Sequence, residues 1–251
     1  MVPPGYERLL LGHAVAVARS DLAASVRHVL IGADGARSTL HEYAARQPGA
    51  RRLQGRGAVY AVSLPRSAER VVVRHSHHGG LFAPLTRDVF LAPTRAPYEL
   101  ETSLELAKRG VPSPSVVAYA LYPSGGLFQK ADVCSREIAG SRDLSQLLVR
   151  GKVAERSAAL DATARLVATL SHAGARHHDL NAKNVLIASE SAYVLDVDRV
   201  TLGGSPQTAL DANLARLNRS LRKWRDQLGA SISDDDIRSL NDSARSAFQT
   251  A

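Results

Sequence analysis

Residues 177–187 are HHDLNAKNVLI, and residues 195–199 are LDVDR. In the first stretch Asp179 and Asn184 lie five positions apart, ahead of an apolar segment, and Asp196 follows at the start of a second polar turn. Phosphoryl transfer needs a carboxylate that orients the attacking hydroxyl and accepts its proton, together with oxygen ligands that hold magnesium on the nucleotide phosphates. Asp179 suits the first task, and Asn184 and Asp196 suit the second.

The combined pattern is more specific than a single tripeptide. An HxDLxxxN motif followed by an apolar strand and an Asp-led turn is typical of a kinase catalytic loop. The alternative is that Asp179 and Asn184 only cap turns, which is a common role for these residue types. The apolar positions between the polar ones match the motif as well, and they favour the catalytic loop.

The chain before this loop has a different pattern from the chain around and after it. Two alternating β-branched runs at 58–64 and 69–75 predict an antiparallel hairpin. The other expected elements are a strand at 13–18, helices at 36–47, 96–110, 153–174 and 211–228, and strands at 116–122, 131–138, 184–187 and 193–196. These patterns predict an α+β fold with two lobes joined near residues 137–140. The first, residues 1–137, holds an N-terminal preamble and a β-rich nucleotide-binding lobe, and the second, residues 138–251, is a helical catalytic lobe.

Length and composition are those of an ordinary globular protein. The 251 residues are 45% hydrophobic and 22% charged, which suffices for one substantial domain or two small lobes. Cys134 is the single cysteine, so an internal disulfide is excluded and a reducing compartment is favoured. No apolar run approaches the roughly 18 residues needed to cross a bilayer, and the N-terminus lacks the order of a signal peptide. We therefore expect a cytoplasmic protein.

The formal net charge of +8 and the pI near 10.0 leave several classes of binding partner open. A basic surface attracts nucleic acid, anionic membranes and phosphorylated or carboxylated substrates, and an arginine-rich composition also follows from a GC-rich genome without any function. No basic motif with interleaved aromatic residues accompanies the arginines, so we expect no nucleic-acid partner.

A short glycine-containing segment precedes the predicted hairpin. Gly55 and Gly57 would let a loop backbone approach the nucleotide phosphates closely, because glycine has no side chain to obstruct it. The pair is shorter than the full glycine pattern of kinases, and an ordinary turn remains an open alternative.

These segments together resemble the protein-kinase-like superfamily. Within it the chain is most similar to the 3-deoxy-D-manno-octulosonic acid (Kdo) kinases, which are related to the lipopolysaccharide core heptose kinases. Three motifs carry this resemblance: the Asp-Leu-Asn-Ala core at 179–182, the Asp-x-Asp-Arg turn at 196–199 and the Asn-Leu-Ala-Arg-Leu segment at 213–217. The resemblance implies a two-lobed protein-kinase-like fold with a β-rich N-lobe and a helical C-lobe.

The resemblance assigns roles to individual residues of this chain. Asp179 would be the catalytic base, and Asn184 and Asp196 would be the magnesium ligands. Glu137 and Ile138 would form the hinge at which adenine meets backbone groups.

Two further residues take nucleotide-binding roles by resemblance. Arg74 occupies the strand position where most kinases place the lysine that grips the nucleotide phosphates, and Glu99 would be its ion-pair partner. Arginine is always charged and binds phosphate through two parallel hydrogen bonds, so it can serve the same role with a different geometry. Glu101 and Glu105 on the same predicted helix remain alternatives to Glu99.

By resemblance, the activity is that of a Kdo kinase, which uses ATP and Mg²⁺ to phosphorylate a hydroxyl of the Kdo sugar on Kdo-lipid A during lipopolysaccharide biosynthesis. The enzyme would then be a cytoplasmic protein in peripheral contact with the inner membrane. One alternative is a related kinase with a heptose or an aminoglycoside as acceptor. The other is a catalytically silent kinase-like binding module, which would not need to retain Asp179, Asn184 and Asp196.

Two surface features are left with more than one interpretation. His75, His77 and His78 lack a companion cysteine or carboxylate at metal-site spacing, so a basic loop for an anionic sugar or lipid phosphate is preferred to a zinc site, and a plain solvated loop remains open. The basic helix 213–228, which contains Trp224, could lie on an anionic membrane or pack in the helical lobe, and packing is favoured. Residues 1 to about 50 yield no functional prediction.

Overall fold

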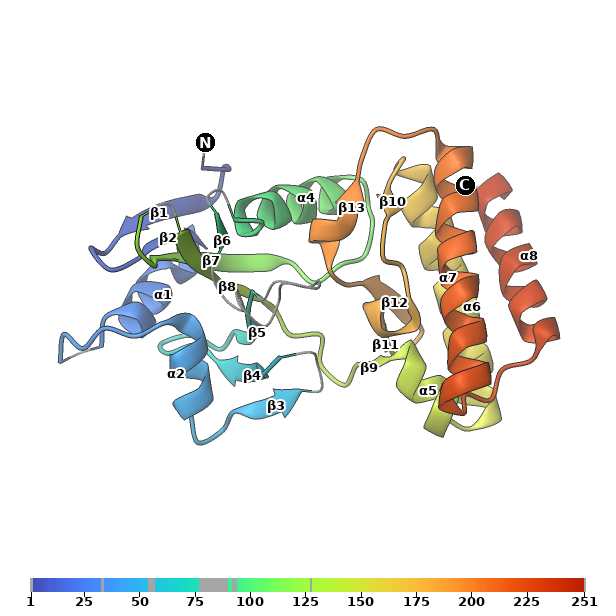
Figure 1. Ribbon diagram of the computed structural model, residues 1–251, viewed down its shortest axis with the longest axis horizontal. Coiled ribbons are helices and arrows are strands. Elements are labelled where there is room, and N and C mark those ends of the chain that lie inside the picture. The colour runs from blue at the N-terminus through green and yellow to red at the C-terminus, as the bar shows by residue number, and fades with distance from the viewer. Residues whose placement is uncertain are drawn as a thin grey trace. The chain divides into compact units, whose positions relative to one another are not determined.

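The computed structural model describes residues 2–32, 34–53, 57–76, 90–91, 94–126 and 128–250 (Figure 1). The chain divides into two compact units. The first unit comprises Met1–Glu101 and Ser115–Glu137, and the second comprises Thr102–Pro114 and Ile138–Ala251.

An antiparallel sheet dominates the first unit (Figure 1). Its strands run in the order β1-β2-β7-β8-β5-β4-β3, and β6 pairs with β8. The strands are β1 (Tyr6–Leu10), β2 (Val15–Arg19), β3 (Arg51–Leu53), β4 (Val59–Ser63), β5 (Arg70–His75), β6 (Phe90–Leu91), β7 (Val116–Pro123) and β8 (Phe128–Arg136). The predicted hairpin of residues 58–75 is confirmed as the β4–β5 pair, in which Val59 lies opposite Arg74.

The N-terminal residues are an integral part of this unit. Strands β1 and β2 extend the sheet beyond β7, and helices α1 (Ala23–Leu30) and α2 (Leu40–Arg46) pack on one of its faces. Leu30 and Leu40 share a buried core with Val71 and Val73 of β5. A capping box starts α2, since the Thr39 hydroxyl accepts a hydrogen bond from the Glu42 amide and the Glu42 carboxylate accepts one from the Thr39 amide.

Strand β5 presents different side chains to the two faces of the sheet. Successive residues of a strand point to opposite faces, so Val71, Val73 and His75 share the face covered by α1 and α2. Arg74 points to the other face, where it meets the first turn of helix α4 (Ala96–Lys108). One face of β5 therefore contributes to the hydrophobic core, and the other face carries the charged Arg74.

Glu137 ties the end of the first unit to two of its strands. Its carboxylate forms ion pairs with Arg51 of β3 at 2.5 Å and with Arg70 of β5 at 2.7 Å, and its amide donates to the Arg70 carbonyl. Burial raises the pKa of the Glu137 carboxyl, but the two guanidinium groups outweigh burial and leave this pKa below its usual range.

The second unit is mainly helical. It contains α5 (Leu144–Arg150), α6 (Val153–His172), α7 (Pro206–Leu228) and α8 (Asp234–Thr250). Its short strands form two small sheets: β9 (Arg142–Asp143), β11 (Val185–Ala188) and β12 (Ser191–Val194) in one, and β10 (Arg176–His177) and β13 (Val200–Thr201) in the other. Leucines of α6 and α7 lie with Val185 and Val194 in one buried core.

Helix α8 was not expected from the sequence. Ser233 caps its start, because the Ser233 hydroxyl accepts a hydrogen bond from the Asp236 amide. Three aspartates in the first turn suit the positive end of the helix dipole. The helix buries only Ile237, Leu240 and Ala244, and so few apolar residues in a polar segment give a weak periodic pattern.

The predicted α+β fold class is confirmed, with a β-rich first unit and a helical second unit. Among the helices of the described chain, none has the length and apolar character needed to cross a membrane.

Candidate active site

The second unit brings Asp179 and Asn184 together in one hydrogen-bonded loop between β10 and β11. The Asn184 side-chain amide donates to the Asp179 carbonyl at 2.9 Å, and the Asn181 amide donates to the same carbonyl at 3.0 Å. The Asn181 side-chain oxygen in turn accepts from the Lys183 amide at 2.9 Å. Asn184 is 8% exposed, so its side chain is fixed by the loop. Its amide nitrogen is committed to Asp179, which leaves the amide oxygen as the atom able to face a cation.

His177 orients the backbone of this loop from within the core. Its Nδ1 accepts a hydrogen bond from the Asp179 amide at 3.1 Å, so Nε2 must carry the proton, which it donates to the Leu195 carbonyl at 2.8 Å. Burial lowers the pKa of the His177 imidazole, with the neighbouring carbonyl and aspartates acting in the opposite direction. The ring is therefore a neutral link between the Asp179 loop and the residue that precedes Asp196.

Asp196 lies beside Asn184 because their backbones are joined. The Leu195 amide donates to the Asn184 carbonyl at 2.9 Å, which places the next residue, Asp196, at the same loop. Asp196 has a left-handed backbone with φ of +52°, a conformation that aspartate and asparagine adopt more readily than most residues. The nearby Asp198 forms an ion pair with Arg199 at 3.6 Å.

Helix α7 fixes the loop with a row of polar side chains. The buried Asn213 accepts a hydrogen bond from the His177 amide at 3.0 Å and donates to the Ala175 carbonyl at 3.0 Å. Two turns later, Ser220 accepts a hydrogen bond from the Ala182 amide at 3.1 Å. Both ends of the loop are thus held by one face of the same helix.

Arg216 lies on this face of α7, between Asn213 and Ser220, and reaches the proposed base. It forms an ion pair with the Asp179 carboxylate, and its Nε donates to the His178 carbonyl at 3.3 Å. One further turn along, Lys183 of the loop lies 5.6 Å from the ring centroid of Trp224. A guanidinium that contacts Asp179 both fixes the carboxylate and keeps a positive charge next to it.

Sequence reasoning missed this polar row, although it recognised the segment that carries it. It treated residues 213–228 as a basic helix that either lies on an anionic membrane or packs in the helical lobe through its leucines. The structure confirms packing, because the three leucines of that face are buried: Leu214, Leu217 and Leu221. The spacing of Asn213, Arg216 and Ser220 within a helix was the pattern that could have revealed a second, polar face.

The first unit holds the residues expected to bind the nucleotide. Arg74 of β5 forms an ion pair with Glu99 of α4, and Glu99 is buried. Glu105, an alternative partner in the sequence, pairs instead with Lys108 and Arg109 of its own helix. Gly57 lies just before β4, whereas Gly55 lies outside the described residues. The role of Arg74 toward a nucleotide stays a prediction.

The histidine cluster is only partly described. His75 donates from Nδ1 to the buried Asp132 at 2.5 Å, while His77 and His78 lie outside the described residues. Within the described ranges, no group of three or more His, Cys, Asp or Glu side chains could hold a metal by itself. Magnesium bound to nucleotide takes one or two protein oxygen ligands besides phosphate and water oxygens, so Asn184 and Asp196 fit it without such a group.

The amino-acid sequence is similar to several known proteins. The sequence matches the family described as Lipopolysaccharide kinase (Kdo/WaaP) over residues 44–242. It is 35% identical over 176 residues to the 3-deoxy-D-manno-octulosonic acid kinase of Xanthomonas campestris pv. campestris strain B100, covering 68% of each chain. It is 33% identical over 192 residues to the enzyme of that name from Xanthomonas oryzae pv. oryzae strain PXO99A, covering 74% of this chain and 75% of that one. A solved structure of WaaP in complex with acyl carrier protein is 19% identical, with a TM-score of 0.45 over 81% of this chain and 90% of that one.

His177 gives the folded chain a pH dependence with a definite sign. Its pKa is lowered in the folded state, whereas the ring in the unfolded state titrates near the ordinary value of about 6.5. Below about pH 6.5 the unfolded state therefore binds a proton that the folded state does not, and stability falls. We expect the urea midpoint to decrease from pH 7 to pH 5, and His177→Gln to reduce that decrease. His172→Gln, at an exposed position of α6, is the control. An equal decrease in wild type and His177→Gln would contradict this role.

Proposed function

Because the chain belongs to the lipopolysaccharide kinase (Kdo/WaaP) family, and is therefore a phosphotransferase, we propose that it transfers the γ-phosphoryl group of ATP to a hydroxyl of the Kdo sugar on Kdo-lipid A. The observation that carries this proposal is the single hydrogen-bonded loop that joins Asp179, Asn184 and Leu195–Asp196. The relatives named Kdo kinases, at 33–35% identity, support the choice of acceptor.

Asp179 is proposed as the base that aligns the acceptor hydroxyl and takes its proton. Its backbone is held from two sides, since its amide donates to His177 and its carbonyl accepts from Asn184. The side chain is about one-third exposed at 31%, so its carboxylate is accessible to a substrate while its backbone is fixed. A carboxylate held in this way can orient a hydroxyl for in-line attack.

Asn184 and Asp196 are proposed to hold Mg²⁺ on the nucleotide phosphates. An amide oxygen and a carboxylate are hard oxygen ligands of the kind that magnesium prefers. When bound, the cation would neutralise negative charge on the phosphates during transfer. The left-handed backbone of Asp196 is the local feature that sets where its carboxylate emerges from the loop.

Arg74 and Glu99 of the first unit are proposed to bind the nucleotide, together with Gly55 and Gly57. Glu99 is buried and forms an ion pair with the Arg74 guanidinium, and a guanidinium is a group that binds phosphate oxygens through parallel N–H bonds.

Arg216 is proposed as a positioning residue that acts through Asp179. Its guanidinium bonds both the Asp179 carboxylate and the His178 carbonyl, so it restricts the rotation of the carboxylate relative to the loop. A positive charge in this place also counters the negative charge of the γ-phosphoryl group as it approaches the base.

We further propose a cytoplasmic enzyme in peripheral contact with the inner membrane. The acceptor is lipid-linked and anionic, and a chain of net charge +8 favours such a surface. Leu214, Leu217 and Leu221 of α7 are buried, so this contact would use basic groups rather than that helix face.

The function is tested by transfer of labelled phosphate from ATP to purified Kdo-lipid A, with heptosylated core and an aminoglycoside as comparison acceptors. We expect labelling of Kdo-lipid A and a decrease of about a hundredfold or more in kcat for Asp179→Asn, because the amide cannot accept the proton. ATP binding measured by calorimetry should persist in this variant. Retention of more than a tenth of the activity would reject Asp179 as the base, and preferential labelling of another acceptor would reassign the substrate.

Asp196→Ala should weaken Mg²⁺-dependent ATP binding, because a carboxylate ligand is lost. Asp196→Asn is the matched control for backbone strain, since asparagine also tolerates a positive φ and keeps an oxygen ligand. We expect a larger loss of ATP affinity in Asp196→Ala than in Asp196→Asn, measured by titration at several Mg²⁺ concentrations. Unchanged affinity and Mg²⁺ dependence in both variants would exclude Asp196 as a ligand.

Arg216→Ala should lower kcat by roughly ten- to a hundredfold with little change in the KM for ATP, because a charge-assisted hydrogen bond to the base is lost. The kcat of Arg216→Lys should lie between those of the wild type and Arg216→Ala, since lysine keeps the charge without the planar fork. Arg219→Ala, at an exposed arginine three residues along the same helix, is the control for net charge. An equal decrease of kcat in Arg216→Ala and Arg219→Ala would indicate a general effect of net charge and would contradict a specific role of Arg216.

A further inference from the structure

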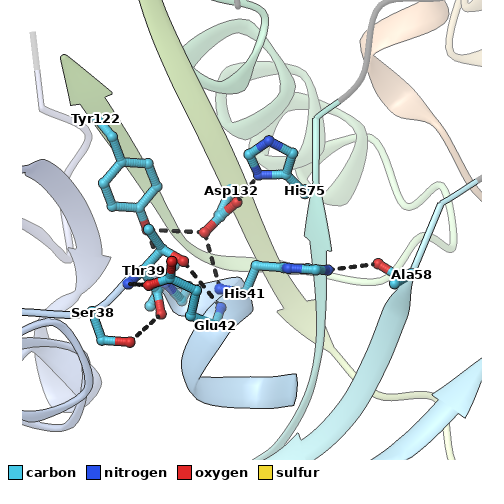
Figure 2. Close-up of polar contacts among 9 residues, drawn as sticks. Ser38, Thr39, His41, Glu42, Ala58, His75, Tyr122 and Asp132 are labelled. Atoms are coloured by element: carbon cyan, nitrogen blue, oxygen red, sulfur yellow. Dashed lines mark hydrogen bonds and ion pairs between the residues drawn. The ribbon is translucent and has the colours of Figure 1, made fainter. Parts of the chain in front are cut away.

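A buried carboxylate in the first unit gathers three separate segments of the chain (Figure 2). Asp132 of β8 is fully buried. It accepts hydrogen bonds from His75 Nδ1 at 2.5 Å, from the Tyr122 hydroxyl at 3.0 Å and from the His41 backbone amide at 3.0 Å. The Tyr122 hydroxyl also accepts from the Leu40 amide at 2.9 Å. These bonds fix the start of α2 against strands β5, β7 and β8.

This network ends beside the residue proposed to bind the nucleotide phosphates. His75 immediately follows Arg74 on β5, and the two side chains point to opposite faces of the sheet. The bond from His75 to Asp132 therefore holds the end of β5 from one face, while the Arg74–Glu99 pair lies on the other. Any movement of β5 at His75 would also move the Arg74 backbone.

The side chain of His41 reaches a second element of the proposed nucleotide site. Its Nε2 lies 2.9 Å from the Ala58 carbonyl, and because a carbonyl only accepts, Nε2 carries the proton (Figure 2). Ala58 lies between Gly57 and the first residue of β4. The His41 ring lies 5.3 Å from that of Tyr60 and 5.7 Å from that of His75, measured between centroids.

We propose that His41 is a positioning residue for the nucleotide: its amide is fixed on Asp132, and its ring holds the backbone at Ala58, directly after Gly57. Glycine leaves a backbone free to adopt many conformations, so an anchor at Ala58 reduces the freedom lost when phosphates bind. This role rests on the proposed function, because it requires that ATP binds near Gly57 and Arg74. It assigns a task to the N-terminal segment that precedes the kinase-like strands.

The side-chain bond of His41 can be separated from the structural network. The bond to Asp132 uses the His41 backbone amide, which every substitution except proline retains. His41→Phe keeps a ring of similar shape beside Tyr60 and His75 but removes the donor to Ala58. His41→Gln offers an amide N–H at a comparable reach and can restore that bond. Both variants should therefore fold with the Asp132 network intact.

The experiment measures the KM for ATP, the KM for Kdo-lipid A and the melting temperature of full-length variants. In His41→Phe the KM for ATP should rise roughly three- to tenfold, as expected for one hydrogen bond, while the KM for acceptor and the melting temperature stay near wild type. His41→Gln should recover most of the ATP affinity. His13→Phe is the control, because the ring nitrogens of His13 also lie near backbone carbonyls of the N-terminal segment, at 3.0 Å from that of Leu11 and 3.4 Å from that of Ser38.

Each other outcome rejects a particular part of the proposal. An unchanged KM for ATP in His41→Phe overturns it, as does a parallel rise of both KM values with a lower melting temperature, which indicates a general structural role. Failure of His41→Gln to recover affinity shows that ring volume matters rather than the hydrogen bond, and also overturns it. Wild-type protein that binds no ATP overturns the proposed function itself, and this inference with it.

Discussion

The Asn213 side chain links a helix to a loop that lies 36 residues earlier in the sequence, by accepting a hydrogen bond from the His177 amide. The loop from 177 to 184 has little regular structure, and its buried backbone groups need partners from elsewhere. Helix α7 supplies them at Asn213 and Ser220, and His177 supplies another within the loop. Without these bonds the proposed base and metal ligands would have no fixed relation to one another.

The first unit has a similar feature, because the buried carboxylate of Asp132 accepts hydrogen bonds from several donors. Asp132 would be costly to bury alone, but its carboxyl oxygens take part in three hydrogen bonds. The strands that it joins include β5, which carries Arg74. In both units, therefore, a buried polar side chain fixes the backbone next to a partly buried charged residue that is proposed to take part in the reaction.

Several arginines of the described chain form ion pairs with carboxylates. Arg74 is paired with Glu99, Arg216 with Asp179, and Arg70 with Glu137. Pairs of this kind contribute little to stability when they are solvent-exposed. We expect these ion pairs to orient the guanidinium groups, because a paired guanidinium has a fixed direction from which it can bind a phosphate or a carboxylate.

The sequence by itself determined the α+β fold class, the β4–β5 hairpin and the loop with Asp179, Asn184 and Asp196, because these depend on local periodicity and on short motifs. It gave no functional role to residues 1–50, and it predicted a basic amphipathic helix at 213–228 without a role in the site. Only the tertiary structure decided that Arg216 meets Asp179 and that His41 meets Ala58. Such partners are distant in the sequence, and a single polar side chain leaves no periodic pattern from which its partner can be inferred.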